Sequence, residues 1–549
     1  MRWLPHATRG RWRTGLTMLL IAAACGIGPA LADDGPTSAE LRNAASSTEW
    51  LLPNHDYSTQ RHVPLTQITR DNAADLRPVC SYDIGDTSRF GSGPLVYRGV
   101  MYVTSGDTTV ALDAATCALR WRHVWRGKNV PDDGGPPRTV ANAFKSRGAA
   151  IKDGKLVRAT SDSHLIVLDL TTGKVLWARQ VAASGQYEFV VMAPLIVDDL
   201  VIAGVGISEY AVKGWLGAFR VSDGEPVWRF NTVPDDGEPG AETWSEVETR
   251  EHGGGGVWVT PAYDADTGLL YAAVGNPVPD FFGDVREGTN LYTGSLIALE
   301  AATGKLQWHR QIVPHDLHDW DVTVAGPLYL TGTGNDTRSL IAVGGKDGIL
   351  RAIDRESRQQ VFATPVTSQD NTGAAPTVPG VRACPGVLGG LQWSHPAYLP
   401  MLNLLVAPAV DWCGTYRKSD DLRHVRGQLY LGGSFSFDVG SSGSGWLTAV
   451  DAASGSVKWR YQSTRPMLAA VTTTASGLVF TGELSGDVLA LDGRDGKVLY
   501  RHDTGMPLHA GVISYAVEGR QYVAVTSGTA TSFWRTPLAS ARVMVFALP

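Results

Sequence analysis

The densest group of side chains that could do chemistry lies in one short acidic stretch in the middle of the chain. Asp316, Asp319 and Asp321 stand there within six residues, bracketed by Pro314 and Trp320. Carboxylates in such a group can take up a proton as general bases or supply hard oxygen ligands to a cation. The same composition is also typical of an acidic turn in contact with water. The flanking proline and tryptophan favour a structured motif.

Three other polar residues stand in glycine-containing loops. They are Glu209 in Gly206-Ile-Ser-Glu209, Asn276 in Gly275-Asn276-Pro277, and Lys346 in Gly344-Gly-Lys346-Asp-Gly348. Charged loop residues are ordinarily solvated. Their types alone therefore assign them no role, and the elements that position them have to be identified first.

One phrase recurs along the chain. An aliphatic residue is followed by a second residue, usually an acid, then by a turn that usually contains glycine, and a large aromatic residue stands eight positions after the second residue. The copies end at Trp121, Trp177, Trp228, Trp308, Phe362, Trp459 and Tyr500. The phrase is typical of a β-hairpin, because the turn glycine can adopt a positive φ between two strands.

Such a hairpin exposes an apolar face that the next copy can cover, as in a β-propeller. The sequence therefore predicts an all-β propeller of four-stranded antiparallel blades over residues 33–549, with the aromatic residues in the seams between blades. Seven copies and one blade closed by both termini predict eight blades. The closing strands are expected around Val523 to Val525 and around Val63 to Ile68. The longer gaps before Glu300 and before Asp451 predict insertions or a degenerate blade.

Residues 1–32 are typical of a secretory leader. Four arginines without an acid precede an apolar run from Leu16 to about Ile27, and Ala30-Leu-Ala32 offers a cleavage site. The run is too short for a comfortable membrane span, and Cys25 stands in a poor lipoprotein context. We expect cleavage after Ala32, a periplasmic location and no later transmembrane segment.

Charge and cysteine content narrow the class of protein further. The chain has 48 basic and 54 acidic residues, and loss of the four leader arginines leaves a net charge of about −10, which argues against nucleic acid or an anionic membrane as a partner. Four cysteines remain in an oxidising compartment, where two disulfides in any of three pairings are plausible. We favour the pairing that is local in sequence, Cys80 with Cys117 and Cys384 with Cys413.

The repeat, together with Asp56-Tyr-Ser58 and Pro64-Leu-Thr-Gln-Ile68, resembles the quinoprotein alcohol dehydrogenases, which include methanol, ethanol and membrane glucose dehydrogenases. Non-enzymatic outer-membrane assembly propellers share the blade repeat, so other motifs must decide. These follow in the family's order: Gly253-Gly-Gly-Gly256-Val-Trp258, Gly275-Asn276-Pro277, Asn290-Leu-Tyr-Thr-Gly-Ser295 and Pro314-His-Asp-Leu-His-Asp319-Trp-Asp321. The resemblance implies pyrroloquinoline quinone (PQQ), a metal ion, and oxidation of a hydroxyl substrate by hydride transfer to the quinone.

The resemblance also implies roles around the metal ion. Glu209 and Asn276 match the family's carboxylate and amide ligands, and Asp319 matches the catalytic base, which can also coordinate the ion. Asp321 matches an acid associated with lanthanide use in methanol and ethanol dehydrogenases. Glucose-oxidising relatives carry the same pattern, so Ca²⁺ and a lanthanide both stay open. Lys346 matches the cation that hydrogen-bonds the quinone oxygens.

Four residues match contacts of the cofactor ring and its carboxylates. Trp258 matches the tryptophan beneath the quinone, where an aromatic face can fix the plane of a flat ring; alternatively it is one more seam aromatic. Arg147 matches an arginine that pairs with a cofactor carboxylate, and Thr160 matches a hydroxyl donor. Asp411 falls where relatives place an asparagine near the cofactor.

Three positions depart from the methanol dehydrogenase pattern. Asn142-Ala143-Phe144 replaces a vicinal cysteine pair, Gly91 an acid or amide, and Leu468 a pocket tryptophan. The changes predict a more open pocket, suited to a bulkier alcohol, a polyol, a sugar or an aldehyde hydrate. Because the chain has no Cys-x-x-Cys-His motif for a c-type haem, electrons are expected to pass to a separate c-type cytochrome or quinone.

Two other interpretations remain. A non-catalytic propeller scaffold would keep the repeats but lose the joint presence of Glu209, Asn276, Asp319 and Lys346. A degenerate relative without the cofactor is compatible with Gly91.

Overall fold

The computed structural model describes residues 35–127, 146–332 and 334–549. The expected leader and the segment Asn142-Ala143-Phe144 lie outside these ranges, so both expectations remain predictions. Within the described ranges, no helix is long and apolar enough to cross a membrane.

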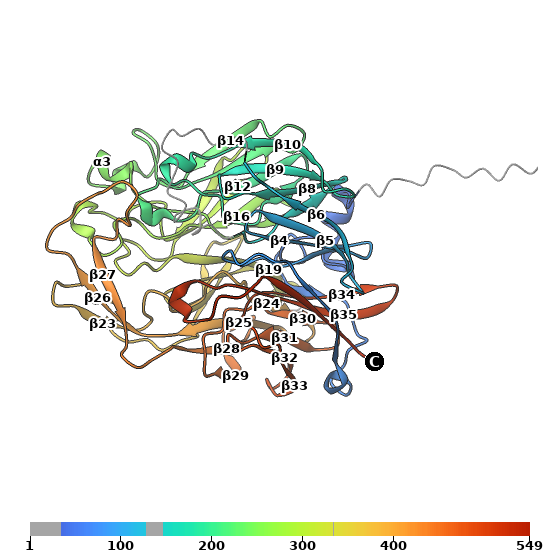
Figure 1. Cartoon of the computed structure of the whole chain (residues 1–549). Helices are drawn as coiled ribbons and strands as arrows, with labels where there is room; N and C mark the ends of the chain where they lie inside the picture. Colours follow the sequence, from blue (N-terminus) through green and yellow to red (C-terminus); the bar gives the residue numbers. More distant parts are fainter. Residues whose placement is uncertain (1–34, 128–145, 333) are drawn as a thin grey trace, which may run out of the picture. The chain divides into compact units, whose positions relative to one another are not determined.

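Antiparallel β-sheets dominate the described chain (Figure 1). Six sheets are built from four strands that follow one another in the sheet: β3 (Leu95–Tyr97), β4 (Val100–Ser105), β5 (Thr108–Asp113) and β6 (Leu119–Val124); β7 (Ala150–Lys152), β8 (Lys155–Ala159), β9 (His164–Asp169) and β10 (Val175–Gln180); β11 (Leu195–Val197), β12 (Leu200–Gly204), β13 (Trp215–Arg220) and β14 (Pro226–Asn231); β15 (Ala262–Asp264), β16 (Leu269–Ala273), β17 (Ser295–Glu300) and β18 (Leu306–Gln311); β19 (Val322–Thr331), β20 (Arg338–Gly345), β21 (Ile349–Asp354) and β22 (Gln360–Pro365); and β24 (Ala397–Leu399), β25 (Leu404–Asp411), β28 (Ser444–Asp451) and β29 (Val457–Ser463).

Within these sheets the fourth strand is the most exposed. β16 and β17 are buried at nearly every position, whereas in β18 buried and exposed positions are mixed. A strand that is covered on both faces reads as a continuous apolar run, and a strand that faces water on one side alternates. This difference fits sheets that stack on one another, as the repeat predicts.

One further sheet joins both ends of the described chain. β2 (Arg77–Asp83) pairs with β36 (Arg542–Ala547), which is followed by β35 (Arg520–Ser527) and β34 (Leu508–Val517). The segment Val523 to Val525 lies in this sheet, as expected.

The prediction that the segment Val63 to Ile68 also takes part in this sheet was wrong. This segment contributes β1 (His62–Val63), which pairs parallel with β30 (Thr472–Thr474) as a fifth strand beside β31 (Leu478–Gly482), β32 (Asp487–Asp492) and β33 (Val498–Asp503). The physical reason is length, because the two residues of β1 cannot supply the six paired positions that β2 offers to β36.

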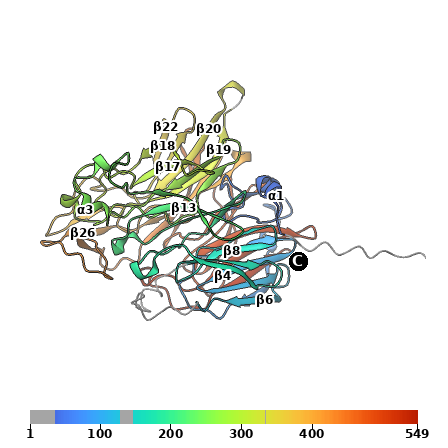
Figure 2. The ribbon, with the colours of Figure 1, turned by 90° about the horizontal axis from the view of Figure 1, so that it is seen from above.

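The insertion expected before Asp451 forms a three-stranded sheet of β23 (Val381–Ala383), β26 (Gly414–Lys418) and β27 (Gly433–Phe437). In Figure 1 this sheet and the short helix α3 (Val247–Arg250) lie toward the same side of the body. In Figure 2 α3 and β26 lie on the side away from α1 (Ser38–Arg42). Both predicted disulfides, Cys80–Cys117 and Cys384–Cys413, are present.

The recurring aromatic residue packs on the turn of the next copy. Trp228 donates its Nε1–H to the carbonyl of Ala301 at 2.9 Å, and a Cβ on Gly304 would collide with the Trp228 ring. The same contact joins Trp121 to Gly173, Trp177 to Gly224 and Trp459 to Gly496. The prediction that these aromatic residues lie in the seams is confirmed.

Replacing Gly304 by alanine tests the seam. Gly304 and Gly268 have nearly the same φ, +71° and +72°, but nothing lies within 4 Å of a Cβ on Gly268. Gly268→Ala should cost about 1–2 kcal/mol through its left-handed backbone, and Gly304→Ala a further ~1–3 kcal/mol through overpacking against Trp228. Urea unfolding followed by circular dichroism measures both, and equal losses would contradict the packing role.

Candidate active site

The residues singled out for chemistry lie in loops at strand ends. Glu209 is in a 3₁₀ turn between β12 and β13, and Asn276 follows β16. Asp319 and Asp321 immediately precede β19, and Lys346 immediately follows β20. Loops carried by rigid strands are the usual place for binding and catalytic groups.

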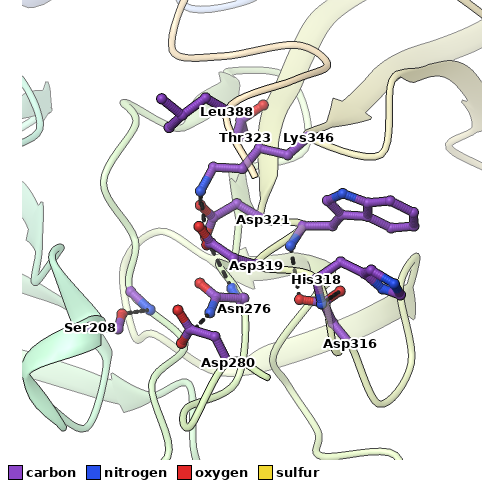
Figure 3. Close-up of polar contacts among 12 residues, drawn as sticks. Ser208, Asn276, Asp280, Asp316, His318, Asp319, Asp321, Thr323, Lys346 and Leu388 are labelled. Carbon is purple, nitrogen blue, oxygen red and sulfur yellow. Dashed lines mark hydrogen bonds and ion pairs between the residues drawn. The ribbon is translucent and has the colours of Figure 1, made fainter. Parts of the chain in front are cut away.

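Lys346 is the centre of the polar contacts shown in Figure 3. Its ammonium lies 2.8 Å from Asp319 Oδ1 and 2.7 Å from Asp321 Oδ2. The other oxygen of Asp321 accepts the backbone N–H of Asn276 at 3.0 Å. The structure therefore brings together four of the predicted site residues. Glu209 belongs to the same electrostatic group, since burial and the charge of Asp321 raise its pKa while Lys346 opposes the rise.

The glycine run before Trp258 ties these loops together. Gly255 N–H donates to the Asn276 carbonyl, and Gly256 N–H donates to Ser208 Oγ beside Glu209 (Figure 3). A Cβ on Gly275 would collide with the Asp321 carboxylate. Glycine is therefore needed here because the backbone approaches neighbouring polar groups closely.

Asp319 is held in a strained conformation by its neighbours. Its φ is +57°, a left-handed value that costs a non-glycine residue about 1 kcal/mol or more. The Asp316 carboxylate accepts the backbone N–H groups of His318 and Trp320 at 3.1 and 2.8 Å. Arg286, which is fully buried, donates to the carbonyl of Asp316 at 2.6 Å. Asp316 thus organises the turn that presents Asp319.

Asp280 is a member of the site that the sequence interpretation missed. Its Oδ1 accepts one amide N–H of Asn276 at 3.1 Å, and the other amide N–H goes to the carbonyl of Pro277. Asp280 is 1% exposed, and within the described part of the chain its Oδ2 has no hydrogen-bond partner. Burial, then the charges of Asp319 and Glu209, raise the pKa of Asp280 well above its usual value. The sequence signal that could have indicated Asp280 is an acid four residues after Asn276 among apolar neighbours.

The site carries an excess of buried negative charge. Burial raises the pKa of Asp319 well above its usual value. The Lys346 ammonium opposes this rise, and the charges of Asp321 and Glu209 add to it. Burial alone would lower the pKa of Lys346, but the charges of Asp319, Asp321 and Glu209 raise it well above its usual value. The Lys346 ammonium therefore lies among the charges of three carboxyl groups and contacts two of them, Asp319 and Asp321.

Within the described ranges, no three Asp, Glu, His or Cys side chains form a ready-made metal cage. Instead, Asp319 and Asp321 face the Lys346 ammonium. The Asn276 amide nitrogen donates to the Pro277 carbonyl and to Asp280, so the amide oxygen is the atom available to a cation. The donor set is entirely oxygen, which is the chemistry that hard cations prefer. The unpartnered Asp280 Oδ2 adds an uncompensated buried oxygen. These residues fit a hard cation.

A second part of the site is aromatic. The guanidinium carbon of Arg147 lies 4.7 Å from the ring centre of Trp258 and 5.0 Å from that of Trp393, a residue that the sequence interpretation missed. Burial lowers the pKa of Arg147 to about 9, and its Nε–H has no hydrogen-bond partner among the described residues. Arg147, Trp393 and Gly91 line a cavity of about 60 Å³. An unpaired guanidinium N–H beside aromatic faces fits a flat ligand that carries carboxylates.

Thr160 and Asp411 lie apart from these contacts. Thr160 Oγ1 donates within its own loop, to the Asp162 carboxylate or the His164 carbonyl. The Asp411 carboxylate accepts hydrogen bonds from Ser368 and from Trp446 Nε1. Neither contacts the Lys346 group in the described part of the chain, so the roles expected for them remain predictions.

Leu468 is 1% exposed and packs in an apolar cluster with Trp412 and Trp534.

The chain is similar to known proteins along most of its length. The β-propeller domain model of the PQQ-type glucose, ethanol and alcohol dehydrogenases matches residues 50–379, and a model of the outer membrane protein assembly factor BamB matches residues 439–547. The quinoprotein alcohol dehydrogenase PedH of Pseudomonas putida is 29% identical over 85% of this chain and 84% of its own length. The quinohemoprotein alcohol dehydrogenase ADH IIB of Pseudomonas putida is 30% identical over 94% of this chain and 78% of its own.

Among solved structures, a europium-containing methanol dehydrogenase superposes with a TM-score of 0.85 at 25% identity, covering 93% of this chain and all of that one. The fold and the site therefore define a propeller enzyme of the quinoprotein class. The chain belongs to the family of PQQ-dependent alcohol dehydrogenases. This result, with the joint presence of Glu209, Asn276, Asp319 and Lys346, favours an enzyme over a scaffold.

Replacing Lys346 by methionine should destabilise the protein in a pH-dependent way. Burial raises the pKa of Asp319 in the folded state. At a pH above that pKa the buried carboxylate is ionised and opposes folding, whereas at lower pH the protonated carboxyl does not. Loss of the ammonium should therefore cost about 3–5 kcal/mol at pH 8 and less at pH 5. Thermal unfolding with a chelator present measures the difference.

Lys458→Met is the matched control, since Lys458 is half-exposed in a surface ion pair with Asp451. It should change stability little at either pH. A Lys346→Met loss that is the same at pH 5 and pH 8 would contradict the assigned ion pairs.

Proposed function

We propose that this protein is a periplasmic dehydrogenase that uses PQQ and a metal ion to oxidise an alcohol, a polyol, a sugar or an aldehyde. The observation that carries the proposal is the placement of Asp319, which a strained turn presents beside Lys346 in a buried, oxygen-rich site. We further propose eight blades, formed by the six consecutive four-stranded sheets, the sheet with β30 to β33 and the sheet that β2 completes.

The residues that would hold the cofactor fall into two groups. Trp258 and Trp393 would contact the flat faces of PQQ, and the unpaired Nε–H of Arg147 would meet one of its carboxylates, with Thr160 and Asp411 as further contacts. Glu209, Asn276, Asp319 and Asp321 would hold Ca²⁺ or a lanthanide ion. When bound, the quinone accepts hydride and the metal ion polarises its reactive carbonyl.

The chain's own residues supply proton transfer and positioning. Asp319 takes the substrate hydroxyl proton on its carboxylate, which must be ionised to do so. Lys346 favours that ionised form against the effect of burial and offers an ammonium to developing negative charge. Asp316 and Arg286 keep the Asp319 turn in place, so the base meets the substrate without reorganisation.

Electrons would then leave to a separate c-type cytochrome or quinone, because the sequence lacks a Cys-x-x-Cys-His motif. Export through a leader ending at Ala32 would place the enzyme in the periplasm, where such acceptors are found.

Replacing Asp319 by alanine or asparagine should lower kcat by about 10²-fold to 10⁴-fold, because the base is lost. Dye-linked oxidation of an alcohol and sugar panel, after reconstitution with PQQ and either Ca²⁺ or La³⁺, measures turnover. Asp266→Asn, in the exposed turn between β15 and β16, is the control and should leave kcat unchanged. Normal turnover in Asp319→Ala would remove its role, and a wild-type protein inactive with both ions would overturn the proposed function.

A further inference from the structure

Asp280 is the buried acid that the proposed chemistry leaves without a role. Its environment does not explain it as a structural residue, since Oδ2 is unpartnered and the side chain is 1% exposed. The nearby Arg286 donates to the backbone carbonyls of Pro279, Asp280 and Asp316 and to the Asn290 amide, not to the Asp280 carboxylate. A buried carboxylate oxygen without a partner is strongly disfavoured unless the group takes up a proton or a positive charge compensates it.

The one hydrogen bond of Asp280 points to the cation site. Asn276 gives one amide N–H to Asp280 Oδ1 and the other to Pro277, which leaves the amide oxygen as the atom free to meet a cation. Partners of this kind commonly fix the orientation of a metal ligand and tune its strength. Asn276 is in turn joined through its backbone N–H to Asp321, which contacts Lys346. Asp280 is therefore linked through one intervening residue, Asn276, to the acids that contact the ammonium.

Charge decides what kind of cation the site would favour. With Asp280, four carboxyl groups (Glu209, Asp280, Asp319 and Asp321) share the electrostatic environment of one lysine, and two of them contact its ammonium. The attraction of a fixed negative charge for an ion grows with the charge of the ion. An additional buried carboxylate therefore stabilises a trivalent ion more than a divalent ion of similar size.

We propose that Asp280 is part of the cation site, where Oδ1 orients the Asn276 amide and Oδ2 supplies the negative charge that makes the site prefer a trivalent lanthanide ion to Ca²⁺. The inference rests on the proposed function only in that the site holds a cation. It concerns which ion is selected and by which residue.

Metal affinity, measured without turnover, tests the proposal. Chelator-treated full-length protein is titrated with La³⁺ and separately with Ca²⁺ by isothermal calorimetry, with and without PQQ. In Asp280→Asn the affinity for La³⁺ should fall by about tenfold or more and that for Ca²⁺ by less, so their ratio falls. Asp280→Glu keeps the charge and should retain the preference. The control variant Asp266→Asn, in the exposed turn between β15 and β16, should change neither affinity.

The outcomes separate this inference from the function. An unchanged ratio in Asp280→Asn, or an equal loss for both ions, would overturn the role of Asp280. Circular dichroism and thermal unfolding of Asp280→Asn and Asp280→Glu show whether each variant is folded, and a folded Asp280→Glu without lanthanide preference would also overturn it. If the wild type selects La³⁺ through Asp280 but oxidises no alcohol or sugar, the proposed function fails and this inference stands.

Discussion

The pairing of the Lys346 ammonium with Asp319 and Asp321 is the interaction on which the site depends. Two ion pairs of 2.7 and 2.8 Å at almost fully buried side chains are stable only if the surrounding groups are fixed, because each unpaired charge would be strongly disfavoured. The surrounding loops provide that fixation. The glycine run joins the loops of Glu209 and Asn276, and Asp316 holds the turn of Asp319 by two backbone hydrogen bonds. The strained φ of Asp319 persists because this network determines it.

The blades act on the site by keeping its loops in register. Four seams are closed by a tryptophan that packs on the next turn and donates to its backbone, as Trp228 does to Ala301; the other three are Trp121, Trp177 and Trp459. The sheet that combines β2 with β34, β35 and β36 ties the two ends of the described chain together. A loop that follows β16 and one that precedes β19 can therefore meet at the same place although they are more than 40 residues apart, as the Asn276–Asp321 contact shows.

How far the sequence predicted this structure depends on whether the signal was local. The hairpin repeat, the seam aromatics and the sequence-local disulfides each depend on short spacings, and these predictions are confirmed. The closing strand was misplaced because pairing between the ends of the chain is not encoded by any local pattern, and β1 and β2 both follow turn-rich segments. The resemblance located Asn276, Asp319, Asp321 and Lys346, which the structure brings together. It could not locate Asp280, Arg286 or Trp393, whose importance comes from burial and from contacts with residues distant in sequence.

The aromatic part of the site follows from the same physical logic as the polar part. The planar guanidinium of Arg147 lies against the rings of both Trp258 and Trp393, and no carboxylate lines the cavity that it shares with Trp393 and Gly91. Aromatic faces stabilise a planar cation by its charge and a planar ring by stacking. Aromatic surroundings that stabilise a planar cation can therefore also stabilise a planar ring. A flat ligand bearing carboxylates would stack on the aromatic faces and accept a hydrogen bond from the unpaired Nε–H of Arg147. The acidic side of the site would attract a cation and this side an anionic ring, so a metal ion bound to an acidic quinone would meet both requirements in a way that neither component does alone.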